Sequence, residues 1–311
     1  MSVTLKQLEA FVWVADLGSF RAAAERLNTT QPNISARIAT LETTLNVTLM
    51  DRDPGSVRLT TKGHQLLEHA RRVLRETEAL IETSGQAQLF DGTLRLGVTE
   101  MIVHTWLRDY LRAFRERYPN ISVELTVDLS ASLEKELFAR TIDLALQNGP
   151  FTRSATGVAD IGRYPLIWVA APQLGLHENG RLSGADLARH PILTHARGTR
   201  PYLQVADHFR GLPDVSARLV PSSNLAAGMQ MAMDGMGVAA IPAAMVVREL
   251  AAGELVRVAY PWAPEDLDFV ARYDARTCPA YVSSAADLAS HVAEIYDQMA
   301  AGTQSSKDKF F

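Results

Sequence analysis

The 311-residue sequence is poor in cysteine, in long apolar runs and in secretion signals. A single cysteine, Cys278, excludes an intrachain disulfide and is typical of a protein of the reducing cytosol. The longest weakly polar stretch, residues 229–247, is interrupted by Asp234 and Pro242, so we expect no membrane span. The N-terminus lacks the basic start and apolar core of a signal peptide. We therefore expect a cytoplasmic protein without a membrane partner.

The sequence also lacks the short motifs of common catalytic and metal sites. It contains no GxSxG, no GxxxxGK[ST] and no HExxH, and no GxGxxG opens a strand-helix-strand unit. His64 and His69 lie five residues apart on an expected helix, which is the wrong spacing for a shared metal ligand. We expect no catalytic activity, no cofactor and no metal.

Basic charge is not in excess either. The net charge is −4, and residues 1–90 hold 10 basic and 10 acidic residues, which leaves 21 and 25 for the rest. Nucleic-acid binding must therefore be argued from local features. With 47% hydrophobic and 21% charged residues, the chain is typical of a soluble globular protein of two or three compact units.

Three short helices and a hairpin are expected at the N-terminus. Gly18 is a plausible C-terminal cap of the first helix, Ser19 an N-cap of the second and Thr30 an N-cap of the third. The expected helices cover residues 4–17, 20–27 and 31–45, and two strands at 49–53 and 57–60 flank a Pro-Gly-Ser turn. This order predicts a helix-turn-helix followed by a wing.

The third helix has two different faces. Ile34, Ile38 and Leu41 form an apolar stripe, while amide, hydroxyl and guanidinium side chains follow the first two turns. Amides and guanidinium groups pair well with adenine and guanine edges in the major groove. A generic three-helix packing module would explain a short polar-faced helix equally well.

Residues 61–87 have apolar or small residues at alternating spacings of three and four, as in the seam of a coiled coil. The pattern runs through Leu66, Leu67, Ala70, Val73, Leu74, Thr77, Leu80, Ile81 and Ser84. We expect a long dimerising helix. The alternative is an amphipathic helix that packs on its own domain.

From residue 91 onward, strand-like and helix-like segments alternate, which predicts parallel βαβ units in two α/β lobes. We expect the chain to cross between the lobes at Tyr164 and Pro165, and to return at Asp268 and Phe269.

The segment SFRAAAERLNTTQPNISARIATLETTLNVTLMDR, followed by VRLTTKG, resembles the LysR-type transcriptional regulators. The resemblance implies a mixed fold: a winged helix-turn-helix (1–60), a linker and dimerisation helix (61–90) and a two-lobed α/β effector domain similar to periplasmic binding proteins (91–302). Lobe I would comprise about 91–164 and 269–302, lobe II about 165–268, and residues 303–311 a tail.

The resemblance also implies which residues contact DNA. The third-helix residues Gln31, Pro32, Asn33, Ser35 and Arg37 would enter the major groove, with Thr30 near a phosphate and Arg52 and Arg58 around the wing. Lys62, beside the wing, would add a phosphate contact. Asn33 and Ala36 depart from the usual residues of the family, which leaves the target half-site open. The alternative interpretation of each basic residue is a solvated surface charge without a role in DNA binding.

The effector is expected between the lobes, where strands end and helices begin. The candidate residues at these ends are Thr99, Glu100, Met101, Ser130, Asn148, His195, Arg197, Arg200, Tyr202 and Asn224. The basic residues favour an organic anion. Glu100 would repel an anion unless it pairs with Arg197 or Arg200, or meets an amine or hydroxyl on the ligand. The alternative for each of these residues is that it caps a helix or satisfies backbone groups in an ordinary loop.

The partners that follow are double-stranded promoter or operator DNA, a small-molecule effector, RNA polymerase and further copies of the chain in a homodimer or homotetramer. Two alternatives remain open. In one, the α/β lobes are an enzyme or solute-binding protein, and the N-terminal helices only drive oligomerisation. In the other, Cys278 is a thiol redox switch, acting between chains or through a sulfenic acid.

Overall fold

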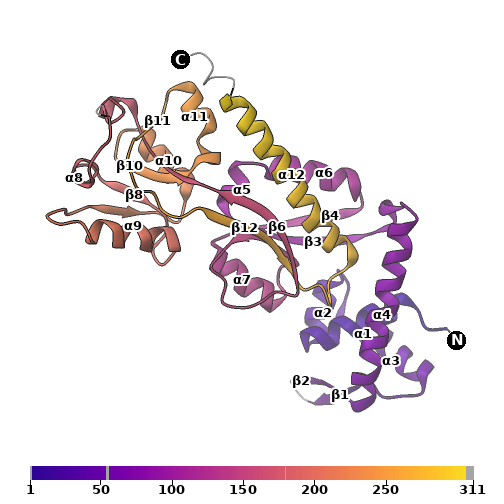
Figure 1. Ribbon diagram of the computed structural model, residues 1–311. Coiled ribbons are helices and arrows are strands. Elements are labelled where there is room, and N and C mark those ends of the chain that lie inside the picture. The colour runs from indigo at the N-terminus through magenta and orange to yellow at the C-terminus, as the bar shows by residue number, and fades with distance from the viewer. Residues whose placement is uncertain (1, 54–55, 179, 306–311) are drawn as a thin grey trace. The chain divides into compact units, whose positions relative to one another are not determined.

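The computed structural model describes residues 2–53, 56–178 and 180–305 (Figure 1). Two compact units are present. Unit 1 comprises the chain up to Thr93 together with Arg117–Ser122 and Arg276–Val282. Unit 2 comprises Leu94–Glu116, Val123–Ala275 and the chain from Ser283 onward. None of the described helices is both long enough and apolar enough to pass through a lipid bilayer.

Unit 1 has the predicted order of three helices, a hairpin and a long helix. Its elements are α1 (Leu5–Leu17), α2 (Phe20–Arg26), α3 (Gln31–Leu45), β1 (Met50–Asp53), β2 (Ser56–Leu59), α4 (Thr61–Thr83) and the short 3-10 helix η1 (Ala87–Leu89). The hydroxyl of Ser19 accepts a hydrogen bond from Ala22 N at 3.2 Å, and that of Thr30 from Asn33 N at 3.4 Å. Both predicted N-caps are therefore confirmed.

The core of unit 1 joins α1, α3 and the start of α4. Ile34, Ile38 and Leu41 are fully buried, as the periodicity predicts, and Leu67 and Ala70 of α4 belong to the same apolar cluster. The predicted seam of α4 is divided, because Val73 is 46% exposed and Leu80 70%. One face of α4 thus packs on its own unit, as the alternative predicted, while dimerisation through the exposed face stays a prediction.

The wing is fastened to α3 and α4 by polar contacts. One carboxylate oxygen of Glu42 in α3 accepts hydrogen bonds from Leu49 N at 2.7 Å and Met50 N at 3.2 Å. The hydroxyl of Thr60 donates to Thr48 O at 2.7 Å and accepts from Gly63 N at 2.9 Å. A Cβ atom on Gly63 would lie 2.1 Å from the carbonyl oxygen of Leu49, so only glycine fits here.

Unit 1 also contains three rings that come from distant parts of the sequence. The ring centroid of Phe90 lies 5.8 Å from that of Tyr118 and 6.0 Å from that of Tyr281, both edge-on. All three residues are buried. Nearby, the carboxylate of Glu78 on α4 accepts a hydrogen bond from Ala280 N at 2.8 Å. The chain beyond α4 is therefore packed against segments 117–122 and 276–282.

Unit 2 is built on two five-stranded sheets. The first has the order β4-β3-β5-β12-β6, with β3 (Gly92–Val98), β4 (Ile121–Val127), β5 (Leu144–Asn148), β6 (Gly157–Tyr164) and β12 (Leu267–Tyr273). The second has the order β11-β7-β10-β8-β9, with β7 (Leu166–Ala170), β8 (Ile192–Thr194), β9 (Leu219–Pro221), β10 (Val238–Pro242) and β11 (Val256–Arg257). These sheets are the two predicted lobes.

Helices cover both sheets, and Figure 1 shows α7 and α12 on opposite faces of the first sheet. The helices are α5 (Glu100–His104), α6 (Leu107–Arg117), α7 (Ser130–Ala139), α8 (Gly184–Ala188), α9 (Arg200–Arg210), α10 (Leu225–Met233), α11 (Val247–Ala252) and α12 (Ala280–Ser305), with the 3-10 helices η2 (Pro172–Leu174) and η3 (Ala243–Met245).

The predicted parallel βαβ units are present, but both sheets also contain antiparallel strands. β3 and β5 are parallel, as are β8 with β9 and β8 with β10, which fits the predicted βαβ units. β12 instead runs antiparallel to β5 and β6, and β7 antiparallel to β10 and β11. β7 and β12 are the first strands after the two crossings, so each enters its sheet from the other lobe. Both sheets are therefore mixed.

One lobe crossing is placed correctly by the sequence. Tyr164 ends β6 and Leu166 begins β7, which confirms the crossing at Pro165. The return at Asp268 and Phe269 is wrong, because both residues lie inside β12 and pair with Arg163 and Gly162 of β6. The return falls earlier, before Leu267. Residues 303–305, expected in a tail, belong to α12, which runs to Ser305, and residues 306–311 lie outside the described residues.

Candidate functional site

Helix α3 presents most of its predicted polar residues on its surface. Gln31, Pro32 and Asn33 are exposed in the first turn, whereas Ser35 and Arg37 are half-buried at its flanks. The amide of Asn33 donates to the Thr29 hydroxyl at 3.2 Å, which fixes its orientation. Burial raises the pKa of Glu9 on α1, and the nearby charge of Arg37 opposes this effect. Arg37 is therefore close enough to α1 for its charge to act on Glu9.

The outermost strip of α3 was missed by sequence reasoning. It consists of Ala36, Ala39, Thr40 and Thr43, all exposed on the side opposite Ile34, Ile38 and Leu41. The Thr40 hydroxyl donates to Ala36 O at 2.8 Å and so lies against the helix. Small side chains let the backbone of a helix approach a partner closely. A helical projection of residues 31–45 would have identified this strip.

The predicted basic residues around the wing are only partly described. Arg58 is exposed on β2, directly across the ladder from Asp51. Lys62 is exposed in the first turn of α4. Arg52 lies on β1, but its side chain is outside the described residues. Thr30 is exposed and serves as the N-cap of α3.

In unit 2, Glu100 of the first lobe contacts helix α10 of the second lobe. One carboxylate oxygen accepts a hydrogen bond from Leu225 N at 2.5 Å and the other from Ala226 N at 3.1 Å. The possible pairing of Glu100 with Arg197 or Arg200 is not observed, because these arginines contact Tyr202 and Glu265. The charge of Glu100 is instead balanced by the N-terminus of α10, which carries a partial positive charge.

Three further polar side chains at this edge are buried without a partner. Among the described residues, no hydrogen bond reaches the hydroxyls of Thr99 and Thr194 or either ring nitrogen of His195. These side chains are only 6–8% exposed. Thr194 was missed by sequence reasoning. It is the last residue of β8, and a polar residue at the end of a strand is the signal on which Asn148 was predicted. Buried polar groups without partners are costly and often mark a binding site.

The buried ring of His195 predicts a pH dependence. Burial lowers the pKa of His195 to about 4, from an ordinary value of 6.5. Between these values the unfolded chain takes up a proton that the folded chain refuses, so stability is complete above pH 6.5 and falls as the pH drops toward 4, by about 3 kcal/mol. In urea unfolding followed by tryptophan fluorescence, His195→Asn should lose this slope, whereas His291→Asn, at an exposed histidine, should keep it. Equal slopes in both variants would contradict the assignment.

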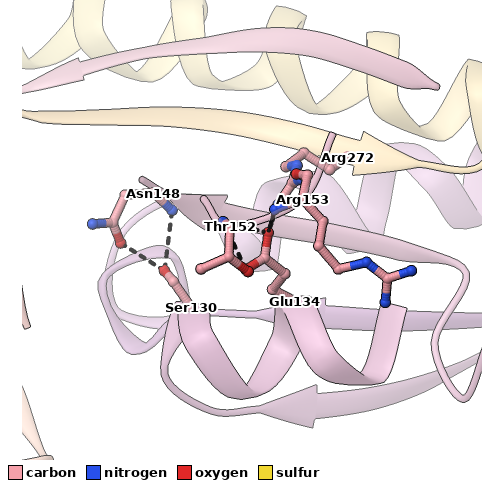
Figure 2. Close-up of polar contacts among 6 residues, drawn as sticks. All are labelled: Ser130, Glu134, Asn148, Thr152, Arg153 and Arg272. Carbon is pink, nitrogen blue, oxygen red and sulfur yellow. Dashed lines mark hydrogen bonds and ion pairs between the residues drawn. The ribbon is translucent and has the colours of Figure 1, made fainter. Parts of the chain in front are cut away.

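Ser130 and Asn148 satisfy each other, as the alternative of a local backbone role predicted, although Ser130 is not the N-cap of α7 (Figure 2). The Ser130 hydroxyl donates to the side-chain oxygen of Asn148 at 2.9 Å and accepts from Asn148 N at 3.2 Å. Met101 is 1% exposed and belongs to the core. These three residues are therefore explained by local structure.

Figure 2 also shows a buried ion pair next to Ser130. Glu134 on α7 accepts hydrogen bonds from Arg272 at 3.0 Å, from Thr152 N and hydroxyl, and from Arg153 N. Burial acts to raise the pKa of Glu134, but the hydrogen bonds from Thr152, Arg272 and Arg153 outweigh it and lower the pKa to about 2. Arg272 also lies 4.0 Å from the ring centroid of Phe151. This network joins α7, β12 and the loop after β5.

The basic cluster of the second lobe has partners of its own. Arg200 forms an ion pair with Glu265. Arg197 donates to the Tyr202 hydroxyl at 3.2 Å. Both arginines are exposed. Asn224 accepts from Ala227 N at 2.6 Å and caps α10. Across the described residues, no three His, Cys, Asp or Glu side chains gather as metal ligands.

Two known families match the chain. Residues 5–64 match the family described as "Bacterial regulatory helix-turn-helix protein, lysR family", and residues 87–290 match the "LysR substrate binding domain". The first match contains α3 and the wing, and the second contains both sheets of unit 2.

Individual proteins are similar over most of the chain. HTH-type transcriptional regulator PtxR of Pseudomonas aeruginosa is 30% identical over 262 residues, which are 84% of this chain and 83% of PtxR. Full-length OxyR from Pseudomonas aeruginosa has the same fold, with a TM-score of 0.60 at 20% identity over 95% of this chain and 96% of OxyR. CbnR in complex with its target DNA has a TM-score of 0.50 at 23% identity over 93% of this chain and 99% of CbnR.

Proposed function

The chain belongs to the LysR family of DNA-binding transcriptional regulators, which have a substrate-binding domain, and from this premise we propose how its two units act. Helix α3 enters the major groove of the target DNA with Gln31 and Asn33 leading. The observation that carries this proposal is the two-faced burial of α3, with Ile34, Ile38 and Leu41 inside and the polar first turn outside. A helix presented in this way is what groove recognition requires.

The small residues of α3 refine this proposal. Because Ala36 and Ala39 lie on the outermost strip, the helix can approach the bases closely, and Gln31 and Arg37 act from its flanks. Pro32, Ser35 and Thr30 complete the surface near the groove. Arg52, Arg58 and Lys62 contact phosphates, which adds salt-dependent affinity without sequence information.

Substitution of Gln31 by Ala is expected to weaken binding to the cognate site by about 1–3 kcal/mol, or roughly 5- to 150-fold, because one bidentate base contact is lost. Arg37→Ala should act in the same direction. Fluorescence anisotropy with the DNA upstream of the protein's own gene, and with a scrambled duplex, measures both affinities. Arg210→Ala, at an exposed arginine of unit 2, is the matched charge control. An equal loss on both duplexes would contradict base recognition by Gln31.

In unit 2 we place the effector where β3, β8 and the N-terminus of α10 meet. Support comes from the buried and unpartnered Thr99, Thr194 and His195. The relatives are transcriptional regulators, which fits a binding site rather than a catalytic one. Arg197, Arg200 and Tyr202, on the exposed loop after β8 and the start of α9, would contribute to effector entry.

Self-association is the remaining part of the proposal. Val73 and Leu80 are exposed and seven residues apart on α4, so they lie on one stripe of the helix. A second copy of α4 would cover this stripe in a homodimer, and two dimers would form the tetramer. RNA polymerase is the partner through which a bound regulator would affect transcription.

A further inference from the structure

Glu100 binds α10 in the manner of a bound carboxylate ligand. Its two oxygens each accept one backbone hydrogen bond, from Leu225 N at 2.5 Å and from Ala226 N at 3.1 Å. The side chain is 16% exposed, and Nε2 of His104 lies 3.5 Å from one of its oxygens. Leu225 and Ala226 are the first two residues of the helix, whose N–H groups have no partner within it. These N–H groups favour an anion.

The remaining first-turn donor of α10 is already used, since Ala227 N donates to Asn224. Among the described residues, Glu100 is therefore the sole anion bound to the N–H groups of Leu225 and Ala226, the two donors that a ligand would need. Because Glu100 lies at the start of α5 in the first lobe and α10 lies in the second, this contact also fastens the lobes together. A ligand carboxylate can take these donors only when Glu100 leaves them.

A small cavity lies beside the same turn of α10. It measures about 10 Å³ and is lined by Thr194, Asn224, Leu225, Gly228 and residues of β10. Such a space holds at most one water molecule, whereas sites that enclose ligands measure about 300–1,000 Å³, so a ligand fits here only after Glu100 moves. Thr194 is 6% exposed, and its hydroxyl has no hydrogen-bond partner among the described residues. The hydroxyl is thus a donor available to a ligand in this cavity.

We propose that the first turn of α10 is a carboxylate subsite, that Glu100 occupies it as a built-in competitor, and that the effector is a small carboxylate that displaces Glu100. This inference rests on the proposed function of unit 2. The sequence predicts an anionic effector and also places the acidic Glu100 at the expected site. Displacement of Glu100 by the effector makes these two features compatible. Displacement of Glu100 also releases the contact between the lobes, so binding of a carboxylate changes how the lobes are held.

The substitution Glu100→Ala tests the subsite directly, because it removes the atoms of one acetate ion. Acetate at ten times its Kd for this variant is expected to raise the thermal midpoint by about 3–6 °C over sodium chloride at equal ionic strength. Wild-type protein should show a much smaller rise, since Glu100 competes. Glu100→Gln, which keeps the shape of the side chain, should bind acetate with intermediate strength and serves if Glu100→Ala does not fold.

The control is Leu225→Pro in the Glu100→Ala background. Proline is tolerated at the first position of a helix, and the preceding Asn224 is extended, with φ −115° and ψ 110°, as proline requires. The change removes one of the two donors and should abolish the acetate effect. Equal acetate effects with and without the Leu225→Pro change, or in wild type and Glu100→Ala alike, would overturn the subsite. Stabilisation of wild type by methylammonium, without any acetate effect on Glu100→Ala, would assign Glu100 to a cationic ligand and overturn it too.

Measurement of DNA affinity on the same proteins distinguishes failure of the carboxylate subsite from failure of the proposed DNA-binding function. A variant that binds its upstream DNA but shows no acetate effect overturns the carboxylate subsite and supports the regulator. If a variant is stabilised by acetate but neither it nor the wild type binds the upstream DNA, the subsite is supported. The proposed recognition of DNA by α3 is then overturned.

Discussion

Replacement of Arg272 by Met is expected to lower the free energy of unfolding of unit 2 by about 3–5 kcal/mol, because it leaves the Glu134 carboxylate buried without its cation. Arg272 is 2% exposed and Glu134 6%, so water cannot replace the lost partner. Urea unfolding followed by tryptophan fluorescence is a suitable measurement, since Trp106, Trp168 and Trp262 are in unit 2 and only Trp13 is in unit 1.

The double variant Glu134→Gln with Arg272→Met is the control for this experiment. It removes both charges, so the cost should be clearly smaller than that of Arg272→Met alone. If the double variant is as unstable as the sum of the two single variants, the effect comes from lost packing against Phe151, and not from the unpaired charge.

The same pair predicts the behaviour of the protein in acid. The pKa of Glu134 is lowered from 4.5 to about 2, so its contribution is complete above pH 4.5 and is lost as the pH falls toward 2. The contribution amounts to about 3 kcal/mol. This window lies below the window of His195, between pH 4 and 6.5, so the two groups can be separated by titration of stability.

Gly63→Ala is expected to destabilise unit 1 by about 3 kcal/mol and to abolish DNA binding near the growth temperature, because the added Cβ would overlap the Leu49 carbonyl. The clash is with backbone, and Leu49 is itself held by the hydrogen bond from its N–H to Glu42, so neither side can give way easily. Anisotropy with the cognate duplex across a temperature series measures the loss.

Gly228→Ala is a matched control for this substitution. Gly228 also lies in a helix, but a Cβ there would meet no atom within 4 Å. The change should therefore leave stability unchanged or raise it by about 0.4–1 kcal/mol, as alanine favours helix over glycine. Similar losses of stability in Gly63→Ala and Gly228→Ala would contradict the explanation of the Gly63 effect by a clash with the Leu49 carbonyl.

The N-terminal unit could be predicted from its sequence because its signals are local. Thr30, Pro32 and the stripe Ile34, Ile38, Leu41 fix the start and the buried face of α3 within a few residues of one another. The same local logic placed Ser19 and the two strands of the wing. The outward strip of Ala36 and Ala39 follows from the same periodicity, but its small side chains carry no hydrogen-bonding group that would indicate DNA recognition.

The parts that could not be predicted depend on distant residues. Strand β6 contains Asp160, Gly162 and Arg163, so its own sequence does not alternate cleanly, and only pairing with β12 makes it a strand. The partner of Glu100 lies 125 residues away and is a pair of backbone N–H groups, which no side-chain pattern reveals. The sequence thus indicated polar residues at strand ends, while the fold determined what each one touches.

The three rings of Phe90, Tyr118 and Tyr281 bear on how the protein should be divided for separate study. A fragment that begins at residue 94 keeps both tyrosines and loses the phenylalanine that lies edge-on to each of them. It would present apolar surface that the intact chain covers, which invites aggregation. A sensing fragment cut before Gln86 retains η1, the ring contacts and the bond from Asn120 to Gln88, and is the better starting point for crystals or ligand screens.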